Sequence, residues 1–273
     1  MLYPITARIV TDSNAPLPVP PPDTSWSAYL KRFHAERPGI TERILTRCRA
    51  EGVDPYQWCA QPLDGQGGPV LDVACGSAPM ADHLTGWMGS DTSSAELHAA
   101  QALHRGPVVL ASAAGLPIPT GALAAAVCSM AMQIIEPVSE AFSELARILR
   151  PDGRAVLLVP TTGPLPWRQA VTYLRLQIAL RQRIRYPNDD AITRARLEAT
   201  ATRVGLRVLS DERRGFSLPL ENDTQVDELL QSLYLPGIEP GRLHDARRAL
   251  SHRTGDELTV PLRRVVLERT RPT

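Results

Sequence analysis

The sequence predicts an α/β fold with a mostly parallel, Rossmann-like sheet that is extended by helices. The first observation is the run Val70-Leu71-Asp72-Val73, which is typical of a strand buried on both faces of such a sheet. The second is Gly76, which permits a tight turn and a close approach of the backbone to a ligand. The third is the apolar spacing from Met80 to Leu84, which predicts a helix whose free N–H groups face that ligand.

A second acid follows at the end of the next predicted strand. Asp91 comes after the apolar stretch Trp87-Met88-Gly89, so its carboxylate is expected at the carboxyl end of that strand. A carboxylate at this place can accept hydrogen bonds from the hydroxyls of a ribose. The glycine turn and this acid together predict a site for a nucleoside-containing cofactor.

One alternative for the glycine turn is a dinucleotide-binding fingerprint, G-x-G-x-x-G with an acid downstream. This chain carries only Gly76 in the turn. Asp72 lies inside the strand, which the dinucleotide fingerprint does not require. The strand acid and the pair Cys75-Gly76 therefore favour a different cofactor.

Four segments, in order and at normal spacing, resemble class I S-adenosylmethionine-dependent methyltransferases. Residues 70–81 (VLDVACGSAPMA) and 89–100 (GSDTSSAELHAA) are similar to motif I and to the region that follows it. Residues 116–130 resemble the family's segment leading into strand four, and 141–153 resemble its helix before strand five. The resemblance covers about residues 68–160, and the four landmarks together are far more specific than any one of them.

The resemblance implies both the fold and the cofactor. The sheet is expected to have seven strands, mostly parallel, with an antiparallel last strand, and the cofactor is expected to be S-adenosyl-L-methionine. The same resemblance implies that the methyl group emerges at the carboxyl end of strand four. The residues expected to bind the cofactor are Asp72, Ala74, Cys75, Gly76, Ala78, Asp91, Thr92, Ser112, Ala113, Ser129 and Met130.

Three positions depart from the family pattern. Ala78 replaces the usual third glycine of motif I, and its methyl group is expected to point toward the path of the cofactor. Ser112 replaces the usual acid at the adenine pocket, so its hydroxyl would bind the exocyclic amine without charge assistance. Leu123-Ala124 replaces the usual Phe-Asp before strand four. These changes leave open a cofactor-binding protein that is catalytically silent or serves another reaction.

Composition shifts divide the chain into five predicted parts. Five prolines between residues 16 and 22 exclude a helix or a central strand there. Trp26, Tyr29 and Phe33 then recur at helical spacing. The parts are a proline-rich extended lead-in (1–23), N-terminal helices forming a cap (24–67), the cofactor-binding core (68–160), a helical insertion that adds to the cap (161–204), and C-terminal strands and helices that complete the core (205–273).

The remaining elements follow from apolar periodicity. One face of residues 138–149 is apolar at helical spacing, and residues 155–159 indicate the fifth strand. Residues 206–209 and 262–267 predict the closing antiparallel strands, with helix over 223–253 between them. Because ligands in such sheets lie outside the carboxyl ends of the strands, the cap is expected to cover those ends.

Composition argues against several classes of protein. The 273 residues suffice for one α/β core of about 200 residues with a helical addition, and the net charge of +1 argues against nucleic-acid binding. The four cysteines lack metal-ligand spacing, so we expect reduced, buried thiols and no metal. No apolar run is long enough for a membrane span and no signal-peptide pattern is present, so we expect a cytoplasmic protein that does not bind membranes. A homodimer is an assembly that the sequence leaves open.

Methyl transfer requires alignment and exclusion of water more than a reactive side chain. A general base helps if the acceptor is a hydroxyl. The two candidates for this catalytic role are Glu136, near strand four, and His34, which would reach the site if the N-terminal helix acts as a lid. No Asn/Asp-Pro-Pro-Tyr-type motif follows strand four, which argues against methylation of base nitrogens or amides. Residues 129–132 resemble instead the small-molecule methyltransferases of quinone and natural-product pathways.

The insertion also carries a basic run. One interpretation is a contact with RNA or an anionic substrate, but a solvated arginine-rich face is favoured. The run consists of Arg181, Arg183, Arg185, Arg194 and Arg196. We therefore expect a small organic methyl acceptor. The alternative, an RNA methyltransferase, would require a steep salt dependence of RNA binding.

Overall fold

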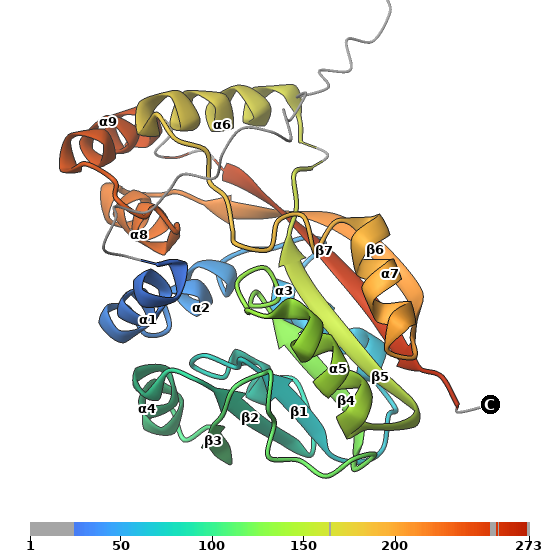
Figure 1. Cartoon of the computed structure of the whole chain (residues 1–273). Helices are drawn as coiled ribbons and strands as arrows, with labels where there is room; N and C mark the ends of the chain where they lie inside the picture. Colours follow the sequence, from blue (N-terminus) through green and yellow to red (C-terminus); the bar gives the residue numbers. More distant parts are fainter. Residues whose placement is uncertain (1–24, 164, 252–254, 256, 272–273) are drawn as a thin grey trace, which may run out of the picture.

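This computed structural model describes residues 25–163, 165–251, 255 and 257–271. These residues form a seven-stranded sheet in the order β3-β2-β1-β4-β5-β7-β6 (Figure 1). Neighbouring strands from β3 to β5 are parallel, whereas β7 runs antiparallel to both β5 and β6. The strands are β1 (Val70–Val73), β2 (Trp87–Asp91), β3 (Val108–Leu110), β4 (Leu123–Ser129), β5 (Leu149–Pro160), β6 (Leu206–Pro219) and β7 (Glu257–Arg269).

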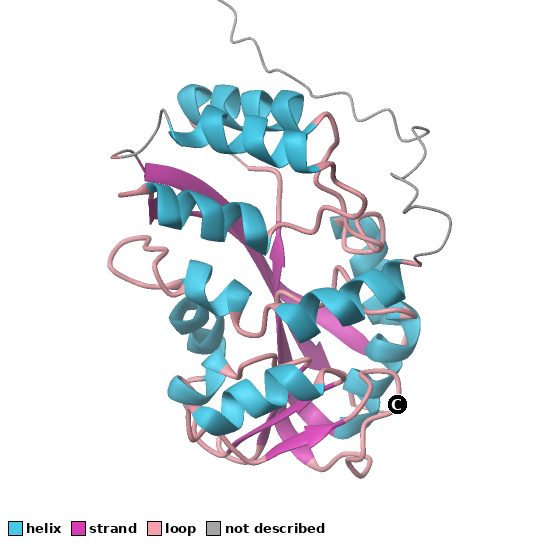
Figure 2. Cartoon of the chain, turned by 90° about the vertical axis from the view of Figure 1, so that its left-hand side faces the viewer, coloured by secondary structure: helices cyan, strands magenta, loops and turns pink. Residues whose placement is uncertain are grey.

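Helices flank the sheet on both sides (Figure 2). Several begin at a side chain that accepts a hydrogen bond from the first turn, such as Ser25, Ser93 and Asn222. The α-helices are α1 (Trp26–Glu36), α2 (Ile40–Leu45), α3 (Pro55–Ala60), α4 (Ser94–Ala102), α5 (Val138–Ile148), α6 (Trp167–Leu180), α7 (Arg194–Arg203), α8 (Asp223–Ser232) and α9 (Pro240–Ser251), and the 3-10 helices are η1 (Gln61–Leu63) and η2 (Pro79–Asp82).

The sheet separates two layers of apolar side chains, and β4 shows how. Ala125 and Val127 pack in the layer that contains α3. Ala126 and Cys128 pack in the layer that contains α5 and α7. All four side chains are fully buried. A central parallel strand that is buried on both faces shows no polar alternation, which explains the continuous apolar run.

β6 and β7 are long, and one end of this pair carries three helices. Figure 1 shows α6 and α9 side by side at the top of the molecule, with α8 below them. Tyr173 of α6 donates its hydroxyl to the Thr259 carbonyl in β7 at 2.8 Å, and the Gln169 amide donates to the Glu257 carbonyl at 2.7 Å. The arrow of β5 points toward this end, so these helices lie beyond its carboxyl end (Figure 1).

The structure confirms the predicted fold class and corrects one element. Residues 80–84 do not begin an α-helix, because only the short 3-10 helix η2 forms there. The Val70 N–H donates to the Gly86 carbonyl and Val70 pairs with Trp87, so the chain must return to the sheet after a few residues. The predicted helix N-terminus is therefore not at this position. α3 fills the space instead, with Trp58 fully buried in the same apolar layer as Met80.

The insertion and the flanking regions also differ in detail from the expectation. α6 packs on α9, but α7 lies on the sheet beside α5, with Leu197 and Ala201 fully buried there. The helices expected over 223–253 are α8 and α9, of which residues 252–253 lie outside the described part. The proline-rich lead-in at 1–23 also lies outside it.

The four cysteines are buried and free. Burial is the main reason that the pKa of Cys48 rises to about 12, and it raises the pKa of the other three thiols as well. These side chains are therefore protonated thiols within the core at neutral pH. In the described part of the chain no group of side chains could hold a metal ion, and no helix has the length and apolar character to cross a membrane.

Candidate functional site

The site begins at the turn after β1, which contains three residues in the left-handed region. Ala74, Gly76 and Ala78 have φ values of 56°, 56° and 62°. The Cys75 N–H donates to the Ser90 carbonyl at 2.9 Å, and the Ala78 N–H donates to the Cys75 carbonyl at 2.8 Å. The turn is thus held against the end of β2 while two alanines occupy a conformation that favours glycine.

We expect Ala74→Gly to raise the free energy of unfolding by about 0.5–1 kcal/mol. A left-handed alanine costs about 1–2 kcal/mol, and the greater freedom of glycine in the unfolded chain offsets part of this gain. Ala78→Gly should be nearly neutral, because the Ala78 methyl is fully buried in the core and its loss costs about 0.8 kcal/mol. Denaturant unfolding of both variants measures the difference, and a destabilised Ala74→Gly would contradict the strain in this turn.

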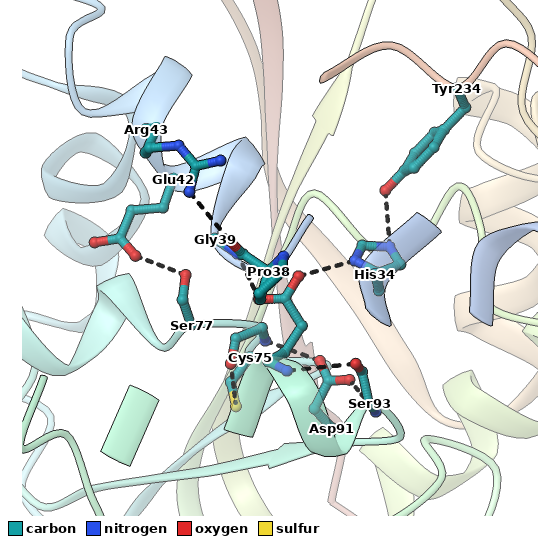
Figure 3. Close-up of polar contacts among 12 residues, drawn as sticks. His34, Pro38, Gly39, Glu42, Arg43, Cys75, Ser77, Asp91, Ser93 and Tyr234 are labelled. Atoms are coloured by element: carbon teal, nitrogen blue, oxygen red, sulfur yellow. Dashed lines mark hydrogen bonds and ion pairs between the residues drawn. The ribbon is translucent and has the colours of Figure 1, made fainter. Parts of the chain in front are cut away.

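Asp91 joins the turn to the end of β2. Its Oδ2 accepts the Gly76 N–H at 2.8 Å, and its Oδ1 accepts the Ser93 N–H at 2.7 Å (Figure 3). Burial raises the pKa of Asp91, and the two amide hydrogen bonds oppose that rise. Each carboxylate oxygen still has a free lone pair for a ligand hydroxyl.

Asp72 lies in β1 beneath the turn and is only 1% exposed. Within the described residues neither carboxylate oxygen has a partner at hydrogen-bond geometry, although the Trp87 indole lies near enough to lower the pKa of Asp72. Burial raises the pKa of Asp72 well above its usual range, and the nearby Asp91 carboxylate adds to the rise. The protonated, neutral form is therefore favoured at this buried position.

We expect Asp72→Asn to stabilise the protein at pH 8. Because the folded pKa is raised, the stability that Asp72 contributes is complete below its unfolded pKa and is lost as the pH rises through the folded pKa. Asparagine has no such loss, so Tm at pH 8 should rise by about 2–4 °C if avoiding this loss gains about 1 kcal/mol. Thermal unfolding from pH 4 to pH 8 measures this, with the exposed Glu198→Gln as a control. If the Tm of Asp72→Asn and the Tm of the wild type depended on pH in the same way, the raised pKa of Asp72 would be contradicted.

The end of β4 forms the second wall of the site. The Ser129 hydroxyl is buried and has no hydrogen-bond partner within the described residues. Met130 follows with a φ of 57°, and its carbonyl accepts the Gln133 side-chain amide at 2.6 Å. A strained residue that its neighbours hold in place is common at ligand sites.

Asn188, from the segment after α6, fixes the residues that follow Met130. Its side-chain amide donates to the carbonyls of Met132 and Ile135, and its backbone N–H donates to the Gln133 carbonyl at 3.0 Å. The side chain is buried. The inserted segment therefore closes over the end of β4.

The N-terminal helices close over the glycine turn from the other side. Gly39, between α1 and α2, donates its N–H to Oε2 of Glu96 at 2.8 Å. His34 Nδ1 lies 3.0 Å from Oε1 of Glu96, and His34 Nε2 lies 3.1 Å from the Tyr234 hydroxyl (Figure 3). Ser77 of the turn donates its hydroxyl to Glu42 of α2 at 2.6 Å. His34 thus lies on the site side of α1, as a lid would place it.

The aromatic residues of α1 are part of the packing of this cap. The Tyr29 and Phe33 rings lie 6.0 Å apart, and the ring of Phe33 lies 4.6 Å from that of Tyr234. Tyr29 accepts the Leu235 N–H at 2.8 Å, and Tyr186 packs edge-on against Tyr234. This arrangement ties α1 to the segment after α8 and to the segment that carries Asn188.

The remaining predicted site residues lie apart from these contacts. Ser112 is exposed, and its hydroxyl accepts the Ala114 N–H at 3.2 Å, while Ala113 is buried beside it. Thr92 is exposed at the end of β2. Glu136 is exposed just before α5, and within the described residues no hydrogen bond or ion pair joins it to His34, Asp91 or Ser129. The structure therefore brings His34, but not Glu136, into the hydrogen-bonded cluster.

Three residues of the site were not predicted: Glu96, Asn188 and Tyr234. Only Glu96 has a signal in the sequence, because it lies on the buried face of α4 beside Leu97 and Ala100, where a charged residue is unusual. Asn188 and Tyr234 come from parts of the chain that lie far from the turn in sequence. Their roles depend on tertiary packing.

The residues present fit a nucleoside cofactor with a sulfonium group. Asp91 offers acceptors to ribose hydroxyls, and Gly76 has no Cβ on the path of approach. The unpartnered Ser129 hydroxyl and the fixed Met130 lie at the end of β4, where the resemblance places the methyl group.

Comparisons with known proteins agree with this fold. Residues 71–157 match the family of methyltransferase domains. No curated protein matches the sequence significantly. Among solved structures, the chain is similar to YcgJ of Bacillus subtilis, with a TM-score of 0.52 and 15% identity over 80% of this chain and 98% of that one.

Two further structures show the same fold. The [4+2]-cyclase SpnF has a TM-score of 0.54 and 16% identity over 94% of this chain and 100% of that one. Phosphoethanolamine N-methyltransferase 2 of Haemonchus contortus, in complex with phosphomonomethylethanolamine and S-adenosylhomocysteine, has a TM-score of 0.57 and 15% identity over 91% of this chain and 61% of that one. From the matched segment and the strand order, residues 71–157 form a methyltransferase domain of the S-adenosylmethionine-dependent kind, whose cofactor is S-adenosyl-L-methionine.

Proposed function

We propose that the protein transfers the methyl group of S-adenosylmethionine to a small organic molecule beneath its own cap. The observation that carries this proposal is that segments of the chain close the site from two sides. His34 and Gly39 contact Glu96 above the glycine turn, and Asn188 holds the residues after β4. A site closed in this way suits a small acceptor better than a large polymer.

The cofactor supplies an activated methyl group on a sulfonium. The residues of this chain bind, orient and exclude water. Asp91, which already accepts the Gly76 N–H, would accept the ribose hydroxyls, and the turn at Gly76 would let the cofactor come close to the backbone. Gln133 and Asn188 fix the segment after β4, so that the acceptor can lie in line with the methyl group. The cap excludes water from this space.

A general base is needed only if the acceptor must lose a proton. A carboxylate oxygen accepts, so His34 donates from Nδ1 to Glu96, and in the neutral imidazole its Nε2 then accepts from the Tyr234 hydroxyl. His34 could take a proton only through the Tyr234 hydroxyl or after that contact is broken. Glu136 is exposed and would require the acceptor to reach toward α5. We therefore propose that alignment and exclusion of water supply most of the rate, with His34 favoured over Glu136 as a base.

The acceptor class follows from the same observations. In the Haemonchus contortus enzyme the bound acceptor, phosphomonomethylethanolamine, is a small molecule. We propose an acceptor of comparable size, of the kind found in quinone or natural-product pathways. The RNA alternative depends on the basic run, of which Arg194 and Arg196 are exposed on α7 and Arg194 lies 3.5 Å from Asp211. The cyclase neighbour shows that this fold also carries other reactions.

Labelled S-adenosylmethionine separates these functions. The protein is incubated with methyl-labelled cofactor and either a panel of small phenols, carboxylic acids and amines or total RNA at two salt concentrations. We expect label in low-molecular-weight products and none in RNA. Label in RNA, with steep loss of binding at the higher salt, would replace the proposal by the RNA function. Cofactor binding without transfer to any acceptor would favour a silent or repurposed protein.

A further inference from the structure

The carboxylate of Glu96 lies directly over the glycine turn. Glu96 is only 4% exposed, and a Cβ placed on Gly76 would lie 3.7 Å from its Oε2. The carboxylate thus faces the side of Gly76 that has no side chain. A buried carboxylate is costly unless hydrogen bonds compensate it, so its partners indicate what it does.

Two donors of the cap occupy part of this carboxylate. The Gly39 N–H donates to Oε2 at 2.8 Å and His34 Nδ1 donates to Oε1 at 3.0 Å. A carboxylate has about four acceptor positions, so Glu96 keeps two of them. Glu96 also lies close enough to Asp91 for its charge to raise the pKa of that carboxyl, although burial is the main cause of the rise.

Asp91 and Glu96 therefore present two carboxylates around one glycine. Oδ2 of Asp91 accepts the Gly76 N–H, and Oε2 of Glu96 faces the Gly76 Cα. In both carboxylates, each oxygen accepts one hydrogen bond from the protein. Each oxygen therefore has one acceptor position left for a ligand. Two neighbouring carboxylates with free acceptor positions match a ligand that brings two hydroxyl donors, which is a vicinal diol.

We propose that Glu96 is a second carboxylate of the ribose site, so that Asp91 and Glu96 each accept one of the two ribose hydroxyls. The inference rests on the function proposed above, because it concerns the same cofactor site. It assigns His34 a positioning role: His34 and Gly39, which belong to the cap, orient Glu96, and His34 is itself held by the Tyr234 hydroxyl. Cofactor binding and closure of the cap are then coupled through one side chain.

Calorimetric titration with S-adenosylhomocysteine and with its 2′-deoxy and 3′-deoxy analogues tests this assignment without any acceptor. The wild type should bind each deoxy analogue about tenfold or more weakly, because each loses a hydrogen bond to a charged group. In Glu96→Ala, binding of S-adenosylhomocysteine should weaken by a similar factor. In this variant, one of the two deoxy analogues should bind as tightly as S-adenosylhomocysteine. In Asp91→Asn, the difference in affinity between S-adenosylhomocysteine and the other deoxy analogue should become smaller.

Glu96→Gln has nearly the same shape as the wild type, so it serves as a second variant if Glu96→Ala does not fold. Glu140→Gln, at an exposed position, is the matched control for loss of a carboxylate. His34→Ala should weaken binding of S-adenosylhomocysteine and should reduce the difference in affinity between it and the same deoxy analogue that Glu96→Ala affects, but by less, because His34 acts through Glu96. In Glu96→Ala and Glu96→Gln, the differences in affinity between S-adenosylhomocysteine and the two deoxy analogues could both remain as in the wild type. In that case Glu96 only stabilises the cap, and the inference is wrong. Failure of the wild type to bind S-adenosylhomocysteine at all would instead contradict the proposed function.

Discussion

Asp91→Ala is expected to weaken binding of S-adenosylhomocysteine by about 1.5–3 kcal/mol, or about 10- to 150-fold. The variant removes the charged acceptor that we propose for the ribose hydroxyls. It also releases the Gly76 and Ser93 N–H groups, which Asp91 accepts at 2.8 and 2.7 Å, so the turn loses its attachment to β2. Isothermal calorimetry measures the affinity.

Asp91→Asn is the matched control, because it keeps the shape and one carbonyl acceptor but removes the charge. Its loss of affinity should lie between those of the wild type and Asp91→Ala. Thermal unfolding of both variants checks that the turn still folds. Unchanged affinity in a folded Asp91→Ala would show that the cofactor binds elsewhere.

Phe33→Ala is expected to lower the free energy of unfolding by about 3–4 kcal/mol, the usual cost of removing a buried phenylalanine. Phe33 is only 2% exposed, and its ring lies 4.6 Å from that of Tyr234 and 5.0 Å from the Arg37 guanidinium carbon. If the cap is an integral part of the folded protein, this loss appears in the main unfolding transition. Denaturant unfolding measures it.

Trp167→Ala is the control for removal of an aromatic side chain. Trp167 is 73% exposed on α6, so its loss should change stability by less than about 0.5 kcal/mol. A Phe33→Ala protein with an unchanged main transition, or with a separate early transition of the cap, would show that α1 is only loosely attached.

The parts of the fold that the sequence predicts are those in which local pattern and burial agree. The run from Val70 to Val73 is buried on both faces, as its apolar character predicts. α5 shows its apolar stripe with Phe142 and Leu145 fully buried. The seven-stranded sheet and its antiparallel last strand also agree with the family resemblance. In each case the information lies within a few neighbouring residues or within one motif.

The prediction of an α-helix from Met80 was wrong, because tertiary packing and not the local pattern determines the structure of this segment. The apolar spacing is present, but β2 must pair with β1 from Trp87 onward, and α3 already covers this face of the sheet. The contacts of the cap could not be predicted for the same reason, because they also depend on tertiary packing. Tyr234 reaches His34 across 200 positions of the chain, and no local pattern records such a contact. Glu96 alone was detectable, as a charged residue on the apolar face of α4.

A crystal structure of the protein with S-adenosylhomocysteine bound tests the central claim most directly. The account predicts the ribose against Asp91, the adenosine passing over Gly76, and the sulfur beside Ser129 and Met130, with α1 closed above through His34. A ligand bound away from the carboxyl ends of β1, β2 and β4, or bound in this place with α1 displaced and the site open to solvent, would contradict it.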